Sequence, residues 1–392
     1  MSFLTTIASA FKAGADPARP PLARSYASPW LFPDAYGLSS PRGTFNYDAA
    51  IRAGYLHNPV AQRAVRLVAE GVGGAPLSSS DPALGALVSA TSAGQSLAET
   101  IAAQLLLHGN GYIQVLKDAR GRPVELFALR PERVTVVPDA SGWPAAFDYR
   151  VGEALLRIDA LDDLGRPNLI HLKGYHPADD HYGAGCLDAA GEAVAIHNAA
   201  AAWNRALLEN GARPSGALVY DTGEPGAVLA PDQFDRLKAE LASAYAGAVN
   251  AGRPMLLEGG LKWQSLSLSP ADMDFATLKA AAAARDIALA FGVPPMLLGL
   301  PGDATYANYR EANRALWRLT LLPLAGKILA AIAEGLAAWF PAATLSVDLD
   351  RVPALVEDRE RLWAQVTAAD FLSAGEKRAL LGLAEPEKPN DA

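Results

Sequence analysis

The stretch FGVPPMLLG, residues 291–299, separates two long helical patterns and thereby decides how the chain is organised. The pattern before it covers residues 271–291, which would reach about 31 Å as an α-helix. Its glycine and two prolines end that helix, because glycine favours a helix end and proline cannot continue one. A loop is expected over residues 296–305, and a second helical pattern covers residues 306–340 with a kink at Pro323.

The part of the chain before this stretch also contains a long helical pattern that ends at a glycine. Residues 188–210 are rich in alanine and predict a helix that Gly211 closes. Between this helix and the next lies a small insertion, for which we expect a strand at 217–220, a helix at 231–249, and two strands at 255–258 and 263–268 around Gly259-Gly260.

Residues 46–185 predict a mixed domain with several hairpins. Spacing of apolar residues indicates a helix over 59–70 that ends at Gly71, and Ser96 with Glu99 predicts a second helix that starts with a capping box. Strands are expected at 112–116, 124–129, 133–137, 147–151 and 169–172, with a turn at 118–121. We find no internal repeat.

The two ends of the chain differ from this middle part. Residues 1–45 contain many prolines but also aromatic side chains, so we expect an arm that lies along a neighbouring surface. Near the other end, a strand is expected at 344–349 and short helices at 357–366 and 373–381. Residues 385–392 are polar and are predicted to be disordered.

Composition excludes several classes of protein. Of 392 residues, 51% are hydrophobic and 19% are charged, which is enough apolar material for a core and argues against disorder. A single cysteine excludes a disulfide framework and a cysteine-rich metal site. The net charge of −8 argues against tight binding of nucleic acid through phosphates. No uncharged apolar run of spanning length is present, and the first residues do not resemble a secretory signal.

Catalytic motifs are scarce. The chain has no phosphate-binding P-loop, no dinucleotide motif, no G-x-S-x-G and no H-E-x-x-H. One polar cluster could hold a metal or serve a cysteine nucleophile, and it consists of His171, His176, Asp179, Asp180, His181 and Cys186. Its spacing fits no compact motif and glycines and proline interrupt it, so we interpret it as a surface loop in which Cys186 begins a helix. A metal-dependent hydrolase or nuclease that uses the His171–His181 loop remains the alternative.

Arg310, Arg314 and Arg318 recur at every fourth residue and form a basic stripe on one helix face. Such a stripe can contact DNA phosphates or an acidic neighbour such as another subunit. The alternative of equal weight is a solvated face with local partners such as Glu311.

Three stretches taken together resemble the portal proteins of tailed bacteriophages, of the HK97 type. They are YGAGCL at 182–187 with WNRALLENGARPSGALVY at 203–220, then GRPMLLEGGLKWQSLSL at 252–268, and FGVPPMLLG, TYANYRE and TLLP within 287–323. The third is the most specific, and residues 46–185 match more loosely through HGNGYIQVLKDARGRPVELFALRPERVTVV. Cys186-Leu187 departs from the Ser-Pro that the family usually carries. The same family serves gene transfer agents, which are particles derived from phages.

The resemblance implies an α+β portal fold with a wing, stem helices, a small α/β clip and a long channel-side helix. The expected parts are an N-terminal arm (1–45), a wing domain (46–187), a stem helix (188–211), the clip (212–268), a second stem helix (269–292), a tunnel loop (293–306), a long kinked helix (307–341), a C-terminal wing or crown segment (342–384) and a disordered tail (385–392).

The resemblance also implies a function and partners. Portal subunits form a ring, typically of twelve, at one capsid vertex of the virion, after assembly in the bacterial host cytoplasm. The ring is the channel for packaging and ejection of double-stranded DNA, and it docks the terminase large subunit, the head–tail adaptor and the major capsid protein. No enzyme activity, cofactor, metal or membrane is expected. The tunnel-loop residues that would face DNA are Leu297, Leu298, Leu300, Pro301, Gly302, Asp303, Thr305 and Tyr306.

Overall fold

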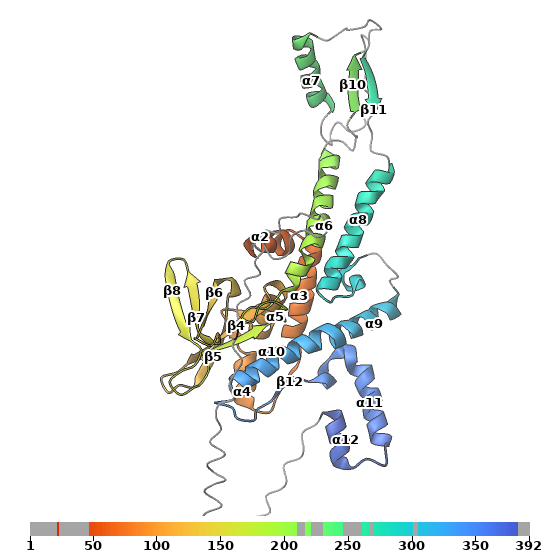
Figure 1. The fold of residues 1–392 in the computed structure, drawn as a ribbon. Coiled ribbons are helices and arrows are strands. Elements are labelled where there is room, and N and C mark those ends of the chain that lie inside the picture. The colour runs from red at the N-terminus through yellow and green to blue at the C-terminus, as the bar shows by residue number, and fades with distance from the viewer. Residues whose placement is uncertain are drawn as a thin grey trace, which may run out of the picture. The chain divides into compact units, whose positions relative to one another are not determined.

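The computed structural model describes Leu22 and residues 47–209, 216–220, 230–245, 261–265, 270–300 and 305–382 (Figure 1). Two compact units are present. Unit 1 comprises Met1–Tyr47, Arg66–Asp188 and Arg314–Ala392, and unit 2 comprises Asp48–Val65 and Ala189–Asn313. The fold therefore combines helices and sheets, as the sequence predicts, and the polypeptide passes more than once between the units.

Unit 1 contains two antiparallel sheets of three strands. The first has the order β5-β4-β9 and the second β6-β7-β8. The strands are β4 (Asn110–Lys117), β5 (Pro123–Leu129), β6 (Val134–Pro138), β7 (Pro144–Val151), β8 (Ala154–Asp159) and β9 (Leu169–Lys173). Tyr112 on the central strand β4 lies opposite Leu129 on β5 and His171 on β9.

A hydrophobic core joins strands of both sheets. In β6, Val134 and Val136 are buried while Thr135 between them is exposed, which is the alternation that a half-buried strand requires. The core cluster consists of Tyr112, Leu129, Val134, Val136, Phe147, Ile158 and Leu169. The aromatic rings of Tyr112 and Phe147 meet edge to face, with centroids 6.0 Å apart.

The remaining elements of unit 1 are helices and short strands. They are α4 (Pro82–Ser89), α5 (Leu97–Leu107), a 3₁₀ turn at Pro131–Arg133, α10 (Leu322–Gly335), 3₁₀ turns at Leu349–Arg351 and Pro353–Leu355, α11 (Val356–Ala368), α12 (Ala374–Leu381), and the strands β1 (Leu77–Ser79), β2 (Thr91–Ser92), β3 (Gln95–Ser96) and β12 (Leu345–Val347). Strand β12 pairs with β1 in antiparallel fashion, so the C-terminal part of the chain completes a sheet that begins near residue 77. Helix α10 packs on α5, β9 and β12 and buries Ile328 and Ile332.

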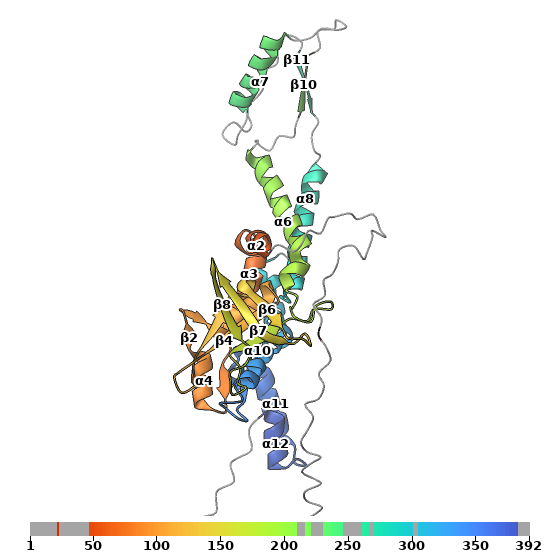
Figure 2. The same ribbon diagram turned by 60° about the vertical axis from the view of Figure 1, so that its left-hand side comes forward.

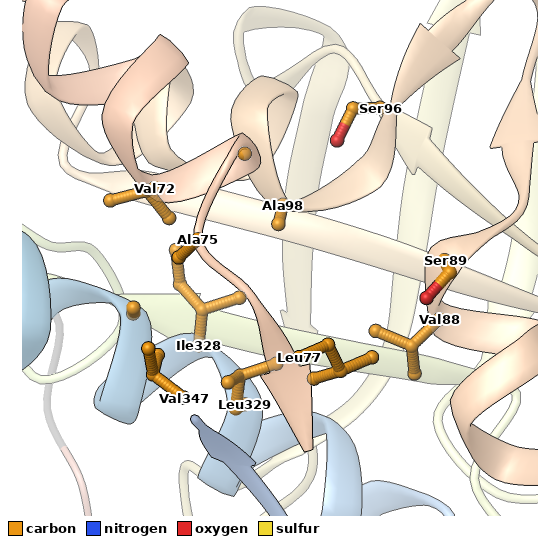
Figure 3. A pocket seen from close by; sticks show the side chains of 12 residues that line it. Val72, Ala75, Leu77, Val88, Ser89, Ser96, Ala98, Ile328, Leu329 and Val347 are labelled. Carbon is orange, nitrogen blue, oxygen red and sulfur yellow. The ribbon is translucent and has the colours of Figure 1, made fainter. Parts of the chain in front are cut away.

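A small cavity lies beside β1 and β12 (Figure 3). Its volume is about 130 Å³ and its lining is mostly aliphatic, with Val72, Leu77, Val88, Ala98, Ile328, Leu329 and Val347 among the contributors. The side chains of Leu77, Ile328 and Leu329 all border this space. A space lined in this way offers few hydrogen-bond partners to water.

Unit 2 contains two long helices with a small module between them in the sequence. Its elements are α2 (Tyr47–Ile51), a π-helical turn (Arg52–Leu56), the start of α3 (Pro59–Gly73), most of α6 (Cys186–Glu209), β10 (Gly216–Tyr220), α7 (Pro231–Tyr245), β11 (Leu261–Ser265), α8 (Pro270–Ala290), a 3₁₀ turn (Pro295–Leu298) and most of α9 (Tyr306–Leu316). Strands β10 and β11 pair in antiparallel fashion, with Gly216 opposite Ser265 (Figure 2).

Within unit 2, hydrogen bonds between polar side chains join α6 to the start of α3. The buried side chain of Asn58 caps α3, because its Oδ1 accepts from the backbone N–H groups of Val60 and Ala61 at 3.1 and 3.0 Å. Its amide Nδ2 donates to Asn198 Oδ1 at 2.9 Å and lies 3.2 Å from His197 Nδ1. Burial of the polar Asn58 side chain is tolerated here because both ends of its amide have partners, while His197 and Asn198 are half-buried.

Several local expectations need correction. Helix α3 continues through Gly71 to Gly73, where packing of its apolar face outweighs the weak helix propensity of glycine. Ser96 precedes α5 as expected, but its side chain makes no cap hydrogen bond, so the capping box is wrong there. A capping box does form at Ser373 and Glu376, at the start of α12. The expected strand at 255–258 lies outside the described residues.

The long helical pattern is interrupted before Pro323 and ends earlier than expected. A π-helical turn, Trp317–Leu321, joins α9 to α10, and the N–H of Leu322 reaches the carbonyl of Trp317 five residues back. Pro323 has no N–H, so the regular ladder cannot continue across it, and a π-turn is one way to absorb the break. Regular helix stops at Gly335, and residues 336–340 form turns.

Among the described residues, the helical run Tyr306–Gly335 is long and apolar enough to cross a membrane by length and composition. In unit 1 its second half buries Ala325, Ile328, Leu329 and Ile332 against protein. These apolar residues therefore build the core of a folded unit.

Candidate functional site

The stretch that separates the two helices is ordered at its start. Helix α8 ends at Ala290, and Gly292 adopts a left-handed backbone with φ of +64°. The side chains of Phe291 and Val293 on either side are each only 2% exposed. This buried pair anchors the end of α8 within unit 2.

The first half of the expected loop is a 3₁₀ turn. Pro295–Leu298 form this turn, and Gly299 ends it with φ of +73°, a value that favours glycine. Leu297, Leu298 and Leu300 are half-buried. The expected irregular loop therefore starts later than residue 296.

The second half of this loop leads into α9. Pro301, Gly302 and Asp303 lie outside the described residues. Thr305 caps α9, since its Oγ1 accepts from the N–H of Asn308 at 3.2 Å, and the Tyr306 side chain is 82% exposed. A large exposed aromatic residue next to a capped helix start is available for contact with another molecule.

Two arginines of the basic stripe have acidic partners on α11 of unit 1. Arg314 Nη2 lies 3.0 Å from Glu357 Oε2, and Arg318 Nη2 lies 2.7 Å from Asp358 Oδ2. The Arg314 side chain is 15% exposed, whereas Arg310, one turn earlier, is exposed. These partners differ from the expected local partner Glu311, and they join the π-turn to the C-terminal helices.

The histidine cluster is divided among separate structural roles. His171 lies on strand β9, within the strand expected at 169–172, and its ring stacks on Tyr112 with centroids 4.3 Å apart. Burial lowers the pKa of His171 to about 3, so the ring is neutral. Its Nε2 donates to Asn110 Oδ1 at 3.2 Å.

The other members of the cluster are also engaged locally. Asp179 Oδ1 accepts from the N–H groups of His181 and Tyr182, and His181 Nε2 donates to the carbonyl of Gly142 at 2.6 Å. Cys186 begins α6 as expected, and burial raises the pKa of its thiol, which disfavours the reactive thiolate. Within the part of the chain that the structure describes, no group of three His, Cys, Asp or Glu side chains is placed to hold a metal ion.

The cluster instead supports a close contact between two chain segments, residues 107–112 and 174–186, which we call the crossing. Gly109 follows α5, and its carbonyl accepts from the N–H of Gly174 at 2.7 Å. A Cβ on Gly183 would overlap the Gly109 carbonyl, and one on Gly185 would lie 2.8 Å from the carbonyl of Leu107. Two motifs that the sequence shows separately, HGNGY at 108–112 and YGAGC at 182–186, are thus two halves of one contact.

Asn110 closes this crossing and was not singled out by the sequence analysis. It is 1% exposed, its Oδ1 accepts from the N–H of Gly183 at 2.8 Å, and its Nδ2 lies 3.1 Å from His108 Nδ1. The signal available in the sequence was a polar residue between two glycines directly before an apolar strand. This arrangement positions the start of α6.

Taken together, the described residues use their titratable side chains to hold helices and sheets in place, which is the character of a structural subunit. The family model of the phage portal protein matches residues 59–382, and the chain belongs to this family. The resemblance to HK97-type portals is confirmed, and the hydrolase or nuclease alternative finds no support. The family is one of structural proteins.

Relatives agree with this membership. A protein of Rickettsia bellii, described only as uncharacterized, is 40% identical over 348 residues, which cover 84% of this chain and 87% of that protein. A chain in the neck of a native gene transfer agent particle, computed with C12 symmetry, is 48% identical with a TM-score of 0.67, covering 88% of this chain and 95% of that one. An HK97 family portal protein from Corynebacterium diphtheriae is 18% identical with a TM-score of 0.56, covering 79% and 100%, and shares the fold.

Proposed function

We propose that twelve copies of this chain form a closed ring at one vertex of a phage-like particle, and that double-stranded DNA passes through the ring. The observation that carries this proposal is the 48% identity to a chain in the neck of a gene transfer agent particle, a neck that was computed with C12 symmetry. A closed ring needs head-to-tail contacts, in which two different faces of each subunit meet. The gene transfer agent neck makes a virion the place of action.

The charge of the chain suits a conduit. Each copy carries a net charge of −8, so twelve copies would carry about −96. Such a ring repels phosphate on the whole and avoids the tight, counterion-releasing contacts that would hold DNA in place. A channel wall has to let DNA slide, and weak contact serves that purpose.

Ring formation is tested directly on the purified full chain. Negative-stain electron microscopy and light scattering should show closed rings with a central opening and a mass of about twelve subunits. A chain that stays monomeric at high concentration, with no rings in particle preparations, would overturn the proposal.

We further propose that the module between α6 and α8, residues 212–268, is the clip that docks the terminase large subunit and the head–tail adaptor. The wing, residues 46–187, would then face the major capsid protein. Support for the clip is its separation in the sequence: β10, α7 and β11 lie between two long helices of unit 2, and Gly216 lies opposite Ser265. The two ends of the module are therefore close enough for a short linker.

Replacing residues 217–264 with a short glycine–serine linker should leave the thermal unfolding of the wing unchanged and abolish pull-down of terminase and adaptor. A matched control exchanges an exposed apolar side chain outside the module, Leu164→Ser, and should leave the pull-down unchanged. Normal DNA packaging by the deletion variant would rule out the clip assignment while leaving ring formation untouched.

The tunnel loop, residues 293–306, is the proposed constriction of the channel. The 3₁₀ turn with half-buried Leu297 and Leu298 gives its first half a defined base, and the exposed Tyr306 offers bulk at its end. Contact of Arg310, Arg314 and Arg318 with DNA or a neighbouring subunit stays a prediction. The ion pairs to α11 favour a structural role for Arg314 and Arg318. Charge reversal of Arg310, whose side chain is exposed, tests contact with DNA or a neighbouring subunit.

A further inference from the structure

Three turns of unit 1 share one hexapeptide, D-x-x-G-x-P. Two of them close the β4–β5 and β6–β7 hairpins, and the third closes the isolated bridge between Leu161 and Pro167. The copies are DARGRP at 118–123, DASGWP at 139–144 and DDLGRP at 162–167, a short internal repeat that the sequence analysis did not expect. In each turn the glycine N–H donates to the aspartate carbonyl, at 2.9, 3.0 and 2.8 Å respectively. The aspartate Oδ1 accepts two further backbone N–H groups, from the second and fourth residues after it.

The three glycines therefore have the same task in the backbone. Their φ values are +72° at Gly121, +85° at Gly142 and +73° at Gly165, all in the left-handed region. The turns are rigid, because the aspartate side chain fixes the backbone on both sides of the glycine. A difference in function among the three turns must therefore come from the atoms that lie next to each glycine.

The space above each glycine differs among the three turns. Nothing lies within 4 Å of a Cβ built on Gly165. A Cβ on Gly121 would meet the end of the flexible Arg166 side chain, with Nη2 at 2.6 Å. A Cβ on Gly142 would overlap the backbone of Leu22, whose carbonyl oxygen, carbonyl carbon and nitrogen are its three nearest atoms.

Leu22 makes a directional contact at this turn. Its N–H donates to the carbonyl of Ser141 at 3.1 Å, and its side chain is half-buried. Pro20 and Pro21 come directly before it, and proline has no N–H, so Leu22 is the first residue after them that can donate.

A buried histidine also holds this turn in place. His181, only 4% exposed, donates from Nε2 to the carbonyl of Gly142 at 2.6 Å. The neighbouring carbonyl of Ser141 is the one that receives Leu22. This turn is rigid, has no side chain at Gly142 and offers a carbonyl that accepts a hydrogen bond. It can therefore bind an extended backbone segment with little loss of its own conformational entropy.

We propose that the turn Asp139–Pro144 is a docking site for the N-terminal segment of the same chain, with Leu22 as the residue that binds. This assignment is independent of the ring and of the DNA channel. It gives the arm a fixed point on unit 1, whereas Leu22 is not among the atoms nearest to the glycines of the other two turns, Gly121 and Gly165.

Trypsin cleavage after Arg24 tests the docking in the purified full chain. Arg24 lies two residues after Leu22, so the protease must take hold of Leu22 to cut there, whereas Arg19 is followed by Pro20 and resists trypsin. Mass spectrometry should show slow cleavage in the wild type and cleavage at least tenfold faster in Gly142→Ala. Gly165→Ala carries a similar backbone strain in a second turn of the same type, where nothing lies within 4 Å of the added Cβ, so this variant should be cut as slowly as the wild type. Equal rates for the wild type and Gly142→Ala, or fast cleavage in both variants, would overturn the proposal.

A second measurement covers the case in which Gly142→Ala does not fold. The pair Leu22→Cys with Ser141→Cys should oxidise to a disulfide within one chain, seen as a faster-migrating monomer on a non-reducing gel, whereas each single variant should not. Dimers would mean that the segment docks on a neighbouring subunit, and absence of any crosslink would mean that it does not dock. Either result would refute docking within the chain.

Discussion

The indole nitrogen of Trp339 donates a hydrogen bond to the carbonyl of Gly121 at 2.8 Å, and so ties the turns after α10 to the β4–β5 hairpin. Two cations lie over the same ring, with Lys117 Nζ at 4.9 Å and Arg166 Cζ at 5.3 Å from its centroid. Lys117 is itself paired with Asp162 at 2.9 Å. The Trp339 side chain thus contacts two of the three D-x-x-G-x-P turns, the one that contains Gly121 and the one that contains Arg166.

Substitutions of Trp339 separate the contribution of its hydrogen bond to stability from the contribution of its aromatic ring. Trp339→Phe keeps an aromatic face but loses the hydrogen bond, and should lower the free energy of unfolding by about 1 kcal/mol. Trp339→Ala loses both and should cost about 2 kcal/mol, less than for a fully buried tryptophan because the side chain is half-buried. Urea denaturation measures both values, and equal stability of the two variants would contradict the role of the ring.

The buried His171 should make unit 1 sensitive to acid. Its pKa is about 3 in the folded chain and about 6.5 when unfolded, so between these values only the unfolded state takes up the proton. Stability should therefore fall as the pH drops below about 6.5, by about 2.5 kcal/mol from this group between pH 7 and pH 4.5. His171→Phe keeps the stacking on Tyr112 and should flatten that dependence, with His176→Gln as the control. An unchanged slope in denaturation curves between pH 4.5 and 7 would contradict this reading.

The glycine crossing should tolerate no side chain. Gly183→Ala places a methyl group on the Gly109 carbonyl and should cost about 2 kcal/mol or more, because both partners are backbone and cannot rotate away. Gly326→Ala is the matched control: it lies exposed in α10 with open space around it, and should stabilise by up to about 1 kcal/mol. Thermal unfolding distinguishes the two, and a neutral Gly183→Ala would count against the crossing.

The cavity beside β1 and β12 should accept a larger side chain. Ala98→Leu adds three carbon atoms toward a space of about 130 Å³ and should raise the free energy of unfolding by about 1 kcal/mol. Ala86→Leu, at an exposed position of α4, should change little. If Ala98→Leu lowers the melting temperature, the space is too narrow to fill.

The tunnel loop is tested through its single charge. Asp303→Arg should add a ring of phosphate contacts and slow packaging, most at low salt where such contacts are strongest. Asp303→Asn removes the charge without adding a contact and should package normally. DNA per particle at two salt concentrations gives the answer, and normal packaging by Asp303→Arg at low salt would mean that this loop does not touch DNA.

Local patterns predicted the elements that carry their own signal. The alanine-rich helix α6 and the helix α8 before Gly292 were expected within two residues of their ends, and β4 with β5 followed from alternation and a turn. Strand β8 was missed because Leu155 and Leu156 are both about half exposed, so no alternation marks it. It forms because β7 offers a paired edge.

Contacts that join distant segments could not be predicted in this way. The pairing of β1 with β12, the overlap of Gly109 with Gly183, and the ion pair of Arg318 with Asp358 all depend on how the chain returns on itself. The strand expected at 169–172 does contain His171, but its pairing with Tyr112 of β4, which takes the ring away from the rest of the polar cluster, could not be inferred from spacing. The family resemblance supplied the function that periodicity alone does not contain.

The pairing of β1 with β12 has a consequence for synthesis on the ribosome. Strand β1 ends at Ser79 and its partner begins at Leu345, 266 positions later (345 − 79). At 5–20 residues per second, roughly 13 to 50 s pass before the partner is made. During that time the edge of β1 has no native strand beside it, which is the kind of open edge that favours pairing with other chains. During this interval, chaperones that cover exposed strand edges would be most effective in keeping a nascent portal chain from pairing with other chains.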